Sequence, residues 1–238
     1  MKEPALLLLP NLLSESRYHE VFLPASVDRA VASLDGLIAE SEQGGRRYLS
    51  HFKMEKKSHE VPIALLNEHS KDEDLDFLLE PIADGQRWGL VSDSGLPCIA
   101  DPGSKLVARA RKRGMLVQAF VGPCSFLLAL MLSGLSGQKF FFHGYLDKDP
   151  IKREKQVIQI ERAAKENQAT QIFMEAPYRN RHLLETLLQR LAPTTLLSVA
   201  WDLTMPSQGV VTHQIAGWRK VVLPNIDKKP AVFLIQVS

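Results

Sequence analysis

Short apolar runs alternate with longer stretches of helical periodicity along this chain. Each run has the length of a buried strand. Helical patterns lie between the runs, at about 71–81, 101–113, 124–134, 151–167 and 179–191. Strands that alternate with helices predict an α/β fold with a largely parallel sheet. The apolar runs lie at 5–9, 61–66, 88–92, 115–120, 139–146, 170–174, 195–200 and 231–237.

Polar residues mark the starts of two of these helices. Ser70, with Glu73 three positions later, has the spacing of a capping box. Asp101 followed by Pro102 predicts an N-cap and a first helical turn. The pattern therefore places one helix directly after Ser70 and the next directly after Asp101.

The length of 238 residues suits one large domain or two domains of about 120 residues each. The chain contains no Gly/Ser-rich linker. The best break falls at Gly114, which also predicts the end of a helix. We expect an N-terminal α/β domain at 1–114 and a C-terminal α/β domain at 115–238.

Composition and charge limit the classes of function. Hydrophobic residues make up 45% and charged residues 24% of the chain, as in an ordinary globular enzyme. The net charge is only +2, so any nucleic-acid site must be a local patch. Two cysteines without metal-type spacing fit a reducing cytoplasm. The first apolar run predicts a buried strand and not a signal peptide, and no run is long enough to span a membrane.

The stretch VSDSGLPCIADPG, at 91–103, follows an apolar strand and precedes a helix. Ligands bind at such strand ends in α/β sheets. Gly95 permits close backbone approach, and Pro97 stiffens the loop. Acidic side chains and carbonyl oxygens suit a ligand that carries a sulfonium and an amino group. The alternative is a structural turn in which Asp101 is only an N-cap, and both interpretations stay open at this point.

A second loop, VGPCSF at 121–126, leads from a strand into an apolar helix. The first N–H groups of a helix lack intrahelical partners and can bind a carboxylate or a ring nitrogen. Alternatively, Ser125 only caps the helix. Cys124 has no neighbouring histidine in the sequence, which argues against a nucleophilic role.

Together these two loops resemble those of the tetrapyrrole methylase superfamily. The similarity is greatest to its branch of bacterial methyltransferases that modify a ribose 2′-hydroxyl in small-subunit ribosomal RNA. That branch has VSDAGTP-x-x-x-DPG followed by PGPC-[AS]. Four further segments resemble family motifs: NEHS at 67–70, FHGYL at 142–146, EAPYR at 175–179 and AWDLT at 200–204. The resemblance runs from about residue 60 to the end of the chain.

The N-terminal third departs from the family pattern. The family has a T-P-x-G-N-L loop after its first strand, whereas residues 9–14 read LPNLLS and lack the glycine. The family's E-D-T-R motif corresponds to residues 40–43, where Ser41 replaces the aspartate. In the family these loops line the substrate side of the cleft, so the departure concerns the substrate more than the cofactor.

The resemblance implies two αβα domains with S-adenosylmethionine in the interdomain cleft, and commonly a homodimer. The N–H groups of residues 124 and 125 would be hydrogen-bond donors to the cofactor. Residues implied in cofactor binding are Asp93, Ser94, Gly95, Leu96, Pro97, Ile99, Gly122, Pro123, Cys124, Ser125, Tyr145, Leu146, Thr204, Pro230 and Ala231.

A ribose hydroxyl is a poor nucleophile, so a nearby base helps its methylation. Glu40 and Glu175 are the candidates by motif, although Glu175 has the alternative role of pairing with Arg179 to hold its loop. Basic residues interleaved with Tyr48 and Phe52 suit an RNA backbone and its bases, or else form a solvated helix face. The expected partner is ribosomal RNA or the small ribosomal subunit, and the expected substrate-binding residues are Arg46, Arg47, Glu68, His69 and Arg179.

Three functions remain open from the sequence. They are ribose methylation of RNA, methylation of a tetrapyrrole or another small acceptor, and cofactor or RNA binding without catalysis. No histidine pair has zinc-ligand spacing, so the sequence predicts no metal site. The basic run at 105–113 is interpreted as solvated surface.

Overall fold

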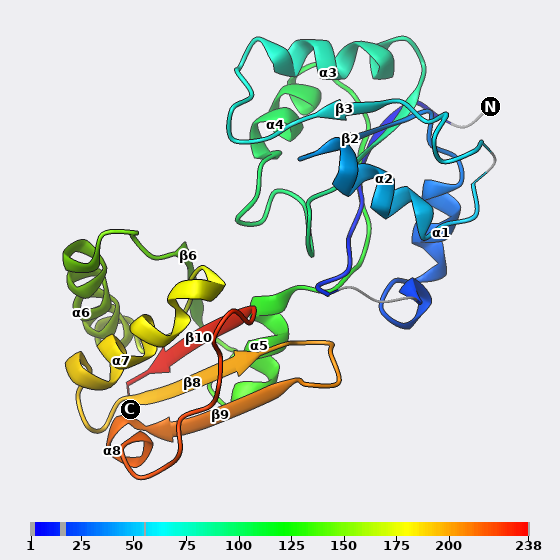
Figure 1. Cartoon of the computed structure of the whole chain (residues 1–238). Coiled ribbons are helices and arrows are strands. Elements are labelled where there is room, and N and C mark those ends of the chain that lie inside the picture. Colours follow the sequence, from blue (N-terminus) through cyan, green and yellow to red (C-terminus); the bar gives the residue numbers. More distant parts are fainter. Residues whose placement is uncertain (1–2, 15–17, 55, 238) are drawn as a thin grey trace. The chain divides into compact units, whose positions relative to one another are not determined.

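The computed structural model describes residues 3–14, 18–54 and 56–237 (Figure 1). The chain divides into two compact units, Met1–Cys124 and Ser125–Ser238. Each unit contains one five-stranded sheet and its own helices. The predicted α/β class is therefore confirmed for both halves of the chain.

The first unit is built on a fully parallel sheet of order β3-β2-β4-β1-β5. Helices cover both of its faces. Alternate side chains of β1 point to opposite faces and therefore belong to different cores. Leu7 packs with α1 and α2, and Leu6 packs with α3 and α4. The elements are β1 (Ala5–Leu8), η1 (His19–Val21), α1 (Ala25–Val31), β2 (Gly36–Ala39), α2 (Glu42–Ser50), β3 (Ile63–Leu65), α3 (Asp74–Ala83), β4 (Arg87–Leu90), α4 (Ser104–Lys112) and β5 (Val117–Ala119).

The second unit has a mixed sheet of order β6-β7-β10-β8-β9. Only β6 and β7 are parallel, and the other three pairs are antiparallel. Helices α6 and α7 pack on one core of this sheet, and α5 contacts β8, β9 and β10. The elements are α5 (Ser125–Ser133), β6 (Phe140–Tyr145), α6 (Pro150–Asn167), β7 (Thr170–Met174), η2 (Pro177–Arg179), α7 (Asn180–Arg190), β8 (Leu196–Trp201), β9 (Gly209–Gln214), α8 (Ile215–Trp218) and β10 (Ala231–Gln236).

All eight apolar runs contain strands, and all five helical patterns contain helices. The prediction of a largely parallel sheet is right for the first unit and wrong for the second. There, β8 and β9 are joined without a crossover helix and therefore pair antiparallel. The sequence analysis also missed the strands β2 and β9 and the helices α1 and α2.

Two predicted helix starts are wrong. Helix α3 begins at Asp74, and the hydroxyl of Ser70 instead accepts a hydrogen bond from the amide of Asn67 at 3.0 Å. Helix α4 begins at Ser104 with Gly103 as its N-cap, so Asp101 is not a cap. Gly103 has φ of +134°, a conformation that favours glycine, and a Cβ there would lie 2.7 Å from the Cys98 sulfur.

The boundary expected at Gly114 differs from the observed division after Cys124. Strand β5 comes after Gly114 but pairs with β1, and this pairing ties it to the first sheet. The long-range pairing, which the local pattern does not reveal, moves the division toward the C-terminus. Within the ranges given above, no helix combines the length and apolar character needed to cross a membrane.

Candidate active site

A cavity of about 820 Å³ lies in the first unit, at the carboxyl ends of β1, β2 and β4. Parallel strands bring their carboxyl ends to one edge, where α/β proteins bind ligands. Helix α2 supplies one wall, and the segments after β1 and β4 supply the others. The cavity is lined by Asn11, Leu12, Leu13, Ser14, Ser41, Gln43, Gly44, Arg47, Tyr48, His51 and Asp93.

Asn11 connects the loop after β1 to the loop after β4. Its side-chain amide donates to the carbonyl oxygens of Ser92 at 2.9 Å and Asp93 at 3.1 Å. Its backbone amide donates to the carbonyl of Gly95 at 2.7 Å. Sequence analysis did not select Asn11 as a site residue, because its partners lie far away in the sequence. Asn11 fixes the path of the loop that carries Asp93–Pro97 and Ile99, six of the predicted cofactor residues.

The loop from Ser92 to Gly103 contains four residues in the left-handed region. These are Gly95 at φ +70°, Cys98 at +70°, Ala100 at +61° and Gly103 at +134°. A non-glycine residue there costs roughly 1–2 kcal/mol. Such strain persists where the surroundings hold it, and it clusters at ligand sites. This geometry favours the ligand-binding interpretation of the loop over that of a simple turn.

Three carboxylates lie together at this sheet edge. One Glu40 oxygen accepts a hydrogen bond from the amide of Asp93 at 2.9 Å. The pKa of Asp101 is raised to about 6, first by burial and then by the negative charges of Glu40 and Asp93. Because these charges repel one another, the edge is suited to a ligand that brings positive charge.

The start of α2 shows how Ser41 replaces the family's aspartate. The Ser41 hydroxyl accepts from the Gly44 amide at 3.0 Å and caps the helix. A Cβ on Gly44 would lie 2.6 Å from the Asp93 carboxylate. The departure from the motif therefore preserves a helix cap and a close approach between α2 and the strained loop.

Arg46 and Arg47 have separate roles. One Arg46 nitrogen donates to the carbonyls of Ser58 at 2.9 Å and Val61 at 2.6 Å, and these bonds tie α2 to the segment before β3. Arg47 lines the cavity. The structure thus gives Arg46 a structural role and leaves Arg47 as the candidate for substrate contact.

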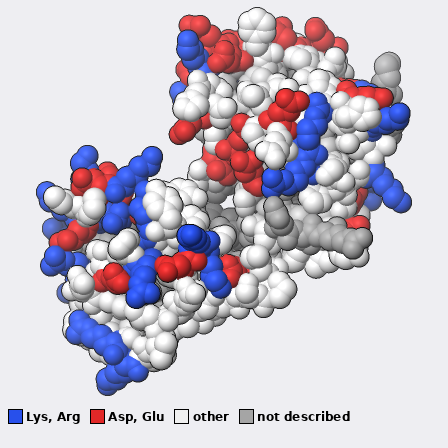
Figure 2. Space-filling model, in the orientation of Figure 1, with Lys and Arg blue, Asp and Glu red and all other residues white. Residues whose placement is uncertain are grey.

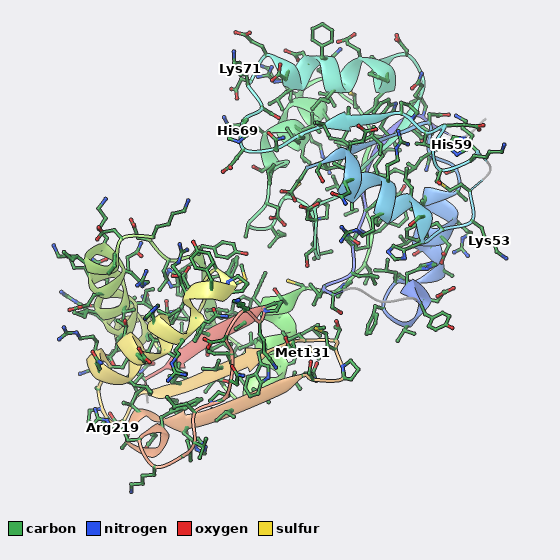
Figure 3. The ribbon with its side chains drawn as sticks, viewed as in Figure 1. Lys53, His59, His69, Lys71, Met131 and Arg219 are labelled. Carbon is green, nitrogen blue, oxygen red and sulfur yellow. The ribbon has the colours of Figure 1, made fainter. Side chains whose placement is uncertain are left out.

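Glu68 and His69 do not join the cavity. Their side chains are 86% and 85% exposed and lie 3.7 Å apart. Figure 3 shows His69 pointing outward from the loop between β3 and α3. Their predicted role in substrate binding receives no support from the geometry of the first unit.

The segment Gly122–Ser125 leads from the first unit into α5. A Cβ on Gly122 would lie 2.0 Å from the Cβ of Pro10, so this close approach requires glycine. Cys124 is buried, and Ser125 is the first residue of α5. Hydrogen-bond donation from the amides of Cys124 and Ser125 to a ligand stays a prediction.

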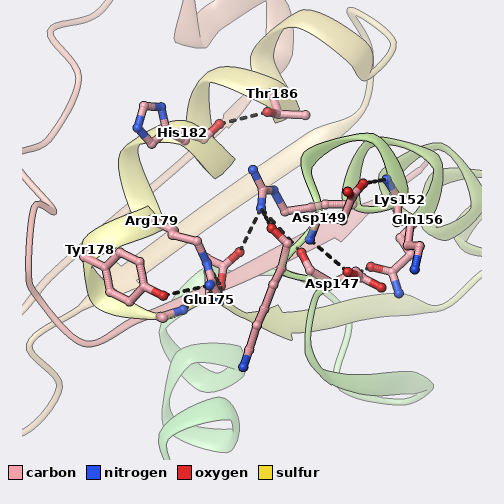
Figure 4. Close-up of polar contacts among 12 residues, drawn as sticks. Asp147, Asp149, Lys152, Gln156, Glu175, Tyr178, Arg179, His182 and Thr186 are labelled. Atoms are coloured by element: carbon pink, nitrogen blue, oxygen red, sulfur yellow. Dashed lines mark hydrogen bonds and ion pairs between the residues drawn. The ribbon is translucent and has the colours of Figure 1, made fainter.

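Glu175, a predicted base, is fully buried in the second unit (Figure 4). It accepts a hydrogen bond from Arg179 Nε at 2.8 Å and lies 3.7 Å from Arg153. It also accepts from the amide of Ala176 at 2.7 Å. Its carboxylate is held between two arginines, and its burial separates it from an acceptor. This geometry favours the alternative in which Glu175 and Arg179 hold their loop.

The other predicted residues of the second unit lie at strand ends. Tyr145 ends β6, and the amide of Leu146 donates to Met174 at 3.2 Å. Thr204 has φ of +71° in the loop after β8. The carbonyl of Pro230 accepts from Asp202 at 3.1 Å, directly before Ala231 begins β10.

Two observations concern metals and thiols. Among the residues that the structure describes, no three His, Cys, Asp or Glu side chains form a group able to hold a metal ion. Burial and the nearby Asp101 raise the pKa of Cys98 to about 11. Cys98 is therefore protonated at neutral pH and is a poor nucleophile.

The fold and the edge loops define a class of protein. Residues 14–217 match the family of Tetrapyrrole (Corrin/Porphyrin) Methylases, and the chain belongs to this family. The match begins at residue 14, so it includes the segment at 40–43 that departs from the family motif but excludes most of the loop at 9–14.

Among its relatives are proteins named Ribosomal RNA small subunit methyltransferase I. The one from Haemophilus influenzae is 30% identical over 207 residues, which cover 86% of this chain and 70% of that protein. The one from Bacillus subtilis is 29% identical, with 78% of this chain and 61% of that protein covered. The one from Leptospira borgpetersenii is 35% identical, with 70% and 64% covered. The match thus spans under two thirds of some relatives.

Solved structures share the fold at low sequence identity. The methyltransferase CobJ matches with a TM-score of 0.65 and 17% identity over 100% of this chain and 95% of its own. Diphthine synthase matches with a TM-score of 0.62 and 15% identity, over 98% and 89%. A Thermus thermophilus uroporphyrin-III C-methyltransferase complexed with S-adenyl homocysteine matches at 0.55 and 14%, over 98% and 96%. The predicted tetrapyrrole methylase fold is confirmed.

Proposed function

We propose that this protein is an S-adenosylmethionine-dependent methyltransferase whose acceptor is a ribose 2′-hydroxyl of small-subunit ribosomal RNA. Membership of a methylase family supports the reaction class. The names of relatives at about 30% identity support the acceptor. The observation that carries the proposal is the strained loop after β4, whose Asp93 lines the cavity of about 820 Å³.

The residues at this edge fit the proposed cofactor. Its sulfonium and amino groups bring positive charge to a place where Glu40, Asp93 and Asp101 repel one another. Gly95 supplies a backbone conformation that brings main-chain atoms close to a ligand. We assign Asp93–Pro97, Ile99 and Gly122–Ser125 to cofactor binding, with Tyr145, Leu146, Thr204, Pro230 and Ala231 as further contacts. The position of the cofactor between the two domains stays a prediction.

When bound, S-adenosylmethionine supplies an electrophilic methyl group. The protein's task is to align the acceptor and exclude water. Glu40 uses one carboxylate oxygen to hold Asp93, and we assign its second oxygen to the acceptor's hydroxyl proton. Glu175 acts instead as a structural anion in the second unit.

Transfer of labelled methyl groups to isolated small ribosomal subunits tests the function. We expect label in ribosomal RNA, at a ribose, in a reaction that requires the protein. Transfer to a corrinoid or another tetrapyrrole, with none to any ribosomal particle, would establish the small-molecule alternative that the family's description favours. Cofactor binding without transfer to either acceptor would establish the non-catalytic alternative.

Arg46 and Arg47 provide a matched pair for the RNA contact. Both variants, Arg46→Ala and Arg47→Ala, remove one positive charge from α2. We expect Arg47→Ala to weaken RNA binding and to lower the salt slope of log affinity by about one. Arg46→Ala should leave that slope unchanged and lower thermal stability, since it removes the bonds to Ser58 and Val61. An unchanged slope in Arg47→Ala would remove this residue from the RNA site.

We also propose a cytoplasmic homodimer. Two cysteines without metal-type spacing fit a reducing compartment. Helix α5 exposes apolar side chains, including Met131 at 78% exposure (Figure 3), and a second copy of the chain would cover them. Light scattering tests the dimer, and Met131→Lys should shift it to monomer. Cell fractionation tests the compartment.

A further inference from the structure

Tyr178 is an exposed aromatic residue with an ordered position. Its side chain lies on η2, and the residue is 69% exposed. Its hydroxyl accepts a hydrogen bond from Arg179 at 2.8 Å, and the Arg179 guanidinium lies 5.0 Å from the ring centroid. An exposed ring that is held in place loses little entropy when another flat group stacks on it.

The buried ion network of Glu175 fixes this ring relative to the start of α6 (Figure 4). Glu175 binds Arg179 on one side and Arg153 on the other. Arg153 in turn donates to the carbonyls of Asp147 at 3.4 Å and Lys148 at 3.3 Å. A continuous chain of contacts therefore joins Tyr178 to the segment that precedes α6.

Lysines surround this network. Lys148, Lys152 and Lys228 are exposed, and none forms an ion pair with any residue that the structure describes. The amide of Lys228 donates to the carbonyl of Pro177 at 3.2 Å, next to Tyr178. Figure 2 shows Lys and Arg side chains gathered over α6, with acidic ones among them.

Fold stability does not account for these lysines. Lys148 and Lys152 lie on either side of the N-cap Asp149 at the start of α6, where the helix dipole disfavours positive charge. The oxygen of Asp149 is engaged by the amide of Lys152, not by its ammonium. By contrast, Arg111 and Lys112 lie in the last turn of α4, where the dipole favours cations.

We propose that Tyr178, Arg179, Lys148, Lys152 and Lys228, here called the Tyr178 surface, bind a single-stranded segment of RNA. An unpaired base stacks on the Tyr178 ring, and the lysines contact the neighbouring phosphates. The inference rests on the proposed RNA acceptor and assigns part of its binding to the second unit.

Tyrosine variants test the stacking. The measurement is the affinity of the full chain for a fluorescent, unstructured RNA of about ten nucleotides. Tyr178→Ala should weaken binding by about tenfold, since it removes the stacking surface. Tyr178→Phe keeps the ring and should bind within about twofold of the wild type. Equal affinity of wild type and Tyr178→Ala would overturn the proposal.

Inorganic polyphosphate separates stacking from charge. It carries phosphates without bases, so Tyr178→Ala should bind it as the wild type does. An equal loss on RNA and on polyphosphate would show that the ring acts only through the charges around it, and would overturn base stacking.

The lysines are tested by salt dependence with a matched control. Lys148→Ala/Lys152→Ala should lower the slope of log affinity against log salt by about 1.4 for single-stranded RNA. Arg111→Ala/Lys112→Ala removes the same charge from another exposed helix and should leave the slope unchanged. Equal slopes for the two double variants would show that only net charge matters and would overturn the surface.

The same variants distinguish this inference from the proposed function. Methyl transfer to small subunits with no effect of Tyr178→Ala on RNA binding would refute the surface and keep the function. Tyr178-dependent RNA binding without any methyl transfer would support the surface and refute the proposed function.

Discussion

The carboxylates of the two units stand in opposite electrostatic environments. In the first unit, Asp101 lies near Glu40 and Asp93, whose charges help to raise its pKa to about 6. In the second unit, Glu175 is fully buried but lies between Arg153 and Arg179. Both arrangements come from family motifs, and from the sequence both Glu40 and Glu175 were candidate bases, with pairing to Arg179 as the alternative role of Glu175.

The difference indicates what each site is for. Buried charges are paired when their role is structural, because an unpaired buried ion costs several kcal/mol. Carboxylates that repel one another lower stability until a positive ligand arrives. The carboxylates of the first unit are thus suited to a positive ligand, whereas the Glu175 carboxylate of the second unit is neutralised by arginines within the fold.

Among the variants that test this comparison of the two units, the largest effect is expected at Glu175. Glu175→Ala leaves two arginines without their partner and should lower the free energy of unfolding by about 3–5 kcal/mol. The control Glu185→Ala removes an exposed partner of Arg181 and should cost less than about 1 kcal/mol. Thermal unfolding of the two variants measures this difference. Similar melting temperatures would show that the Glu175 network does not hold the second unit.

Gly95→Val should weaken the affinity for the cofactor by about a hundredfold or more, which is a loss of about 2.7 kcal/mol in binding free energy. A Cβ at Gly95 would lie 3.2 Å from Leu13, in a backbone conformation with φ of +70° that valine resists. The matched control is Gly114→Val, at φ +72° with open surroundings. Gly114→Val has a similar backbone cost of roughly 1–2 kcal/mol, but this cost arises away from the loop after β4. Calorimetry with S-adenosylmethionine measures both, and equal affinities would make the loop merely structural.

Asp101→Asn should stabilise the protein by about 1 kcal/mol at pH 7.5, allowing for solvent screening. The pKa of Asp101 in the fold is about 6, above its ordinary value of 3.8, so the folded state holds the proton more tightly. Wild-type stability therefore falls as pH rises from about 4 to above 6, whereas asparagine does not titrate. Melting temperatures should coincide near pH 4 and separate above pH 6. A constant difference across this range would contradict the pKa shift.

The smallest effect concerns Cys98. With its pKa at about 11, this thiol should react with iodoacetamide at pH 8 at least tenfold more slowly than N-acetylcysteine. Asp101→Asn should speed the reaction slightly, because Asp101 contributes to the raised pKa. A rate equal to that of the free thiol would show that the loop does not shield Cys98.

Local patterns in the sequence determined much of the fold. The apolar runs located eight strands, since a buried strand needs only a short run of large apolar side chains. The two glycine-rich loops located the carboxyl edge of the first sheet, because their motifs lie directly after strands. Strand β2, which pairs with β3 and β4, and strand β9, which pairs with β8, were both missed.

Only the tertiary structure separated residues of the same type. Arg46 and Arg47 are neighbours in the sequence, yet one bonds to Ser58 and Val61 and the other lines the cavity. Asn11 became a site residue only through its bonds to the loop after β4. The sequence determined which chemical groups are present and which elements carry them. Pairing between distant segments decided which charges are neutralised and which face a ligand, because electrostatic energies depend on distance and burial and not on position along the chain.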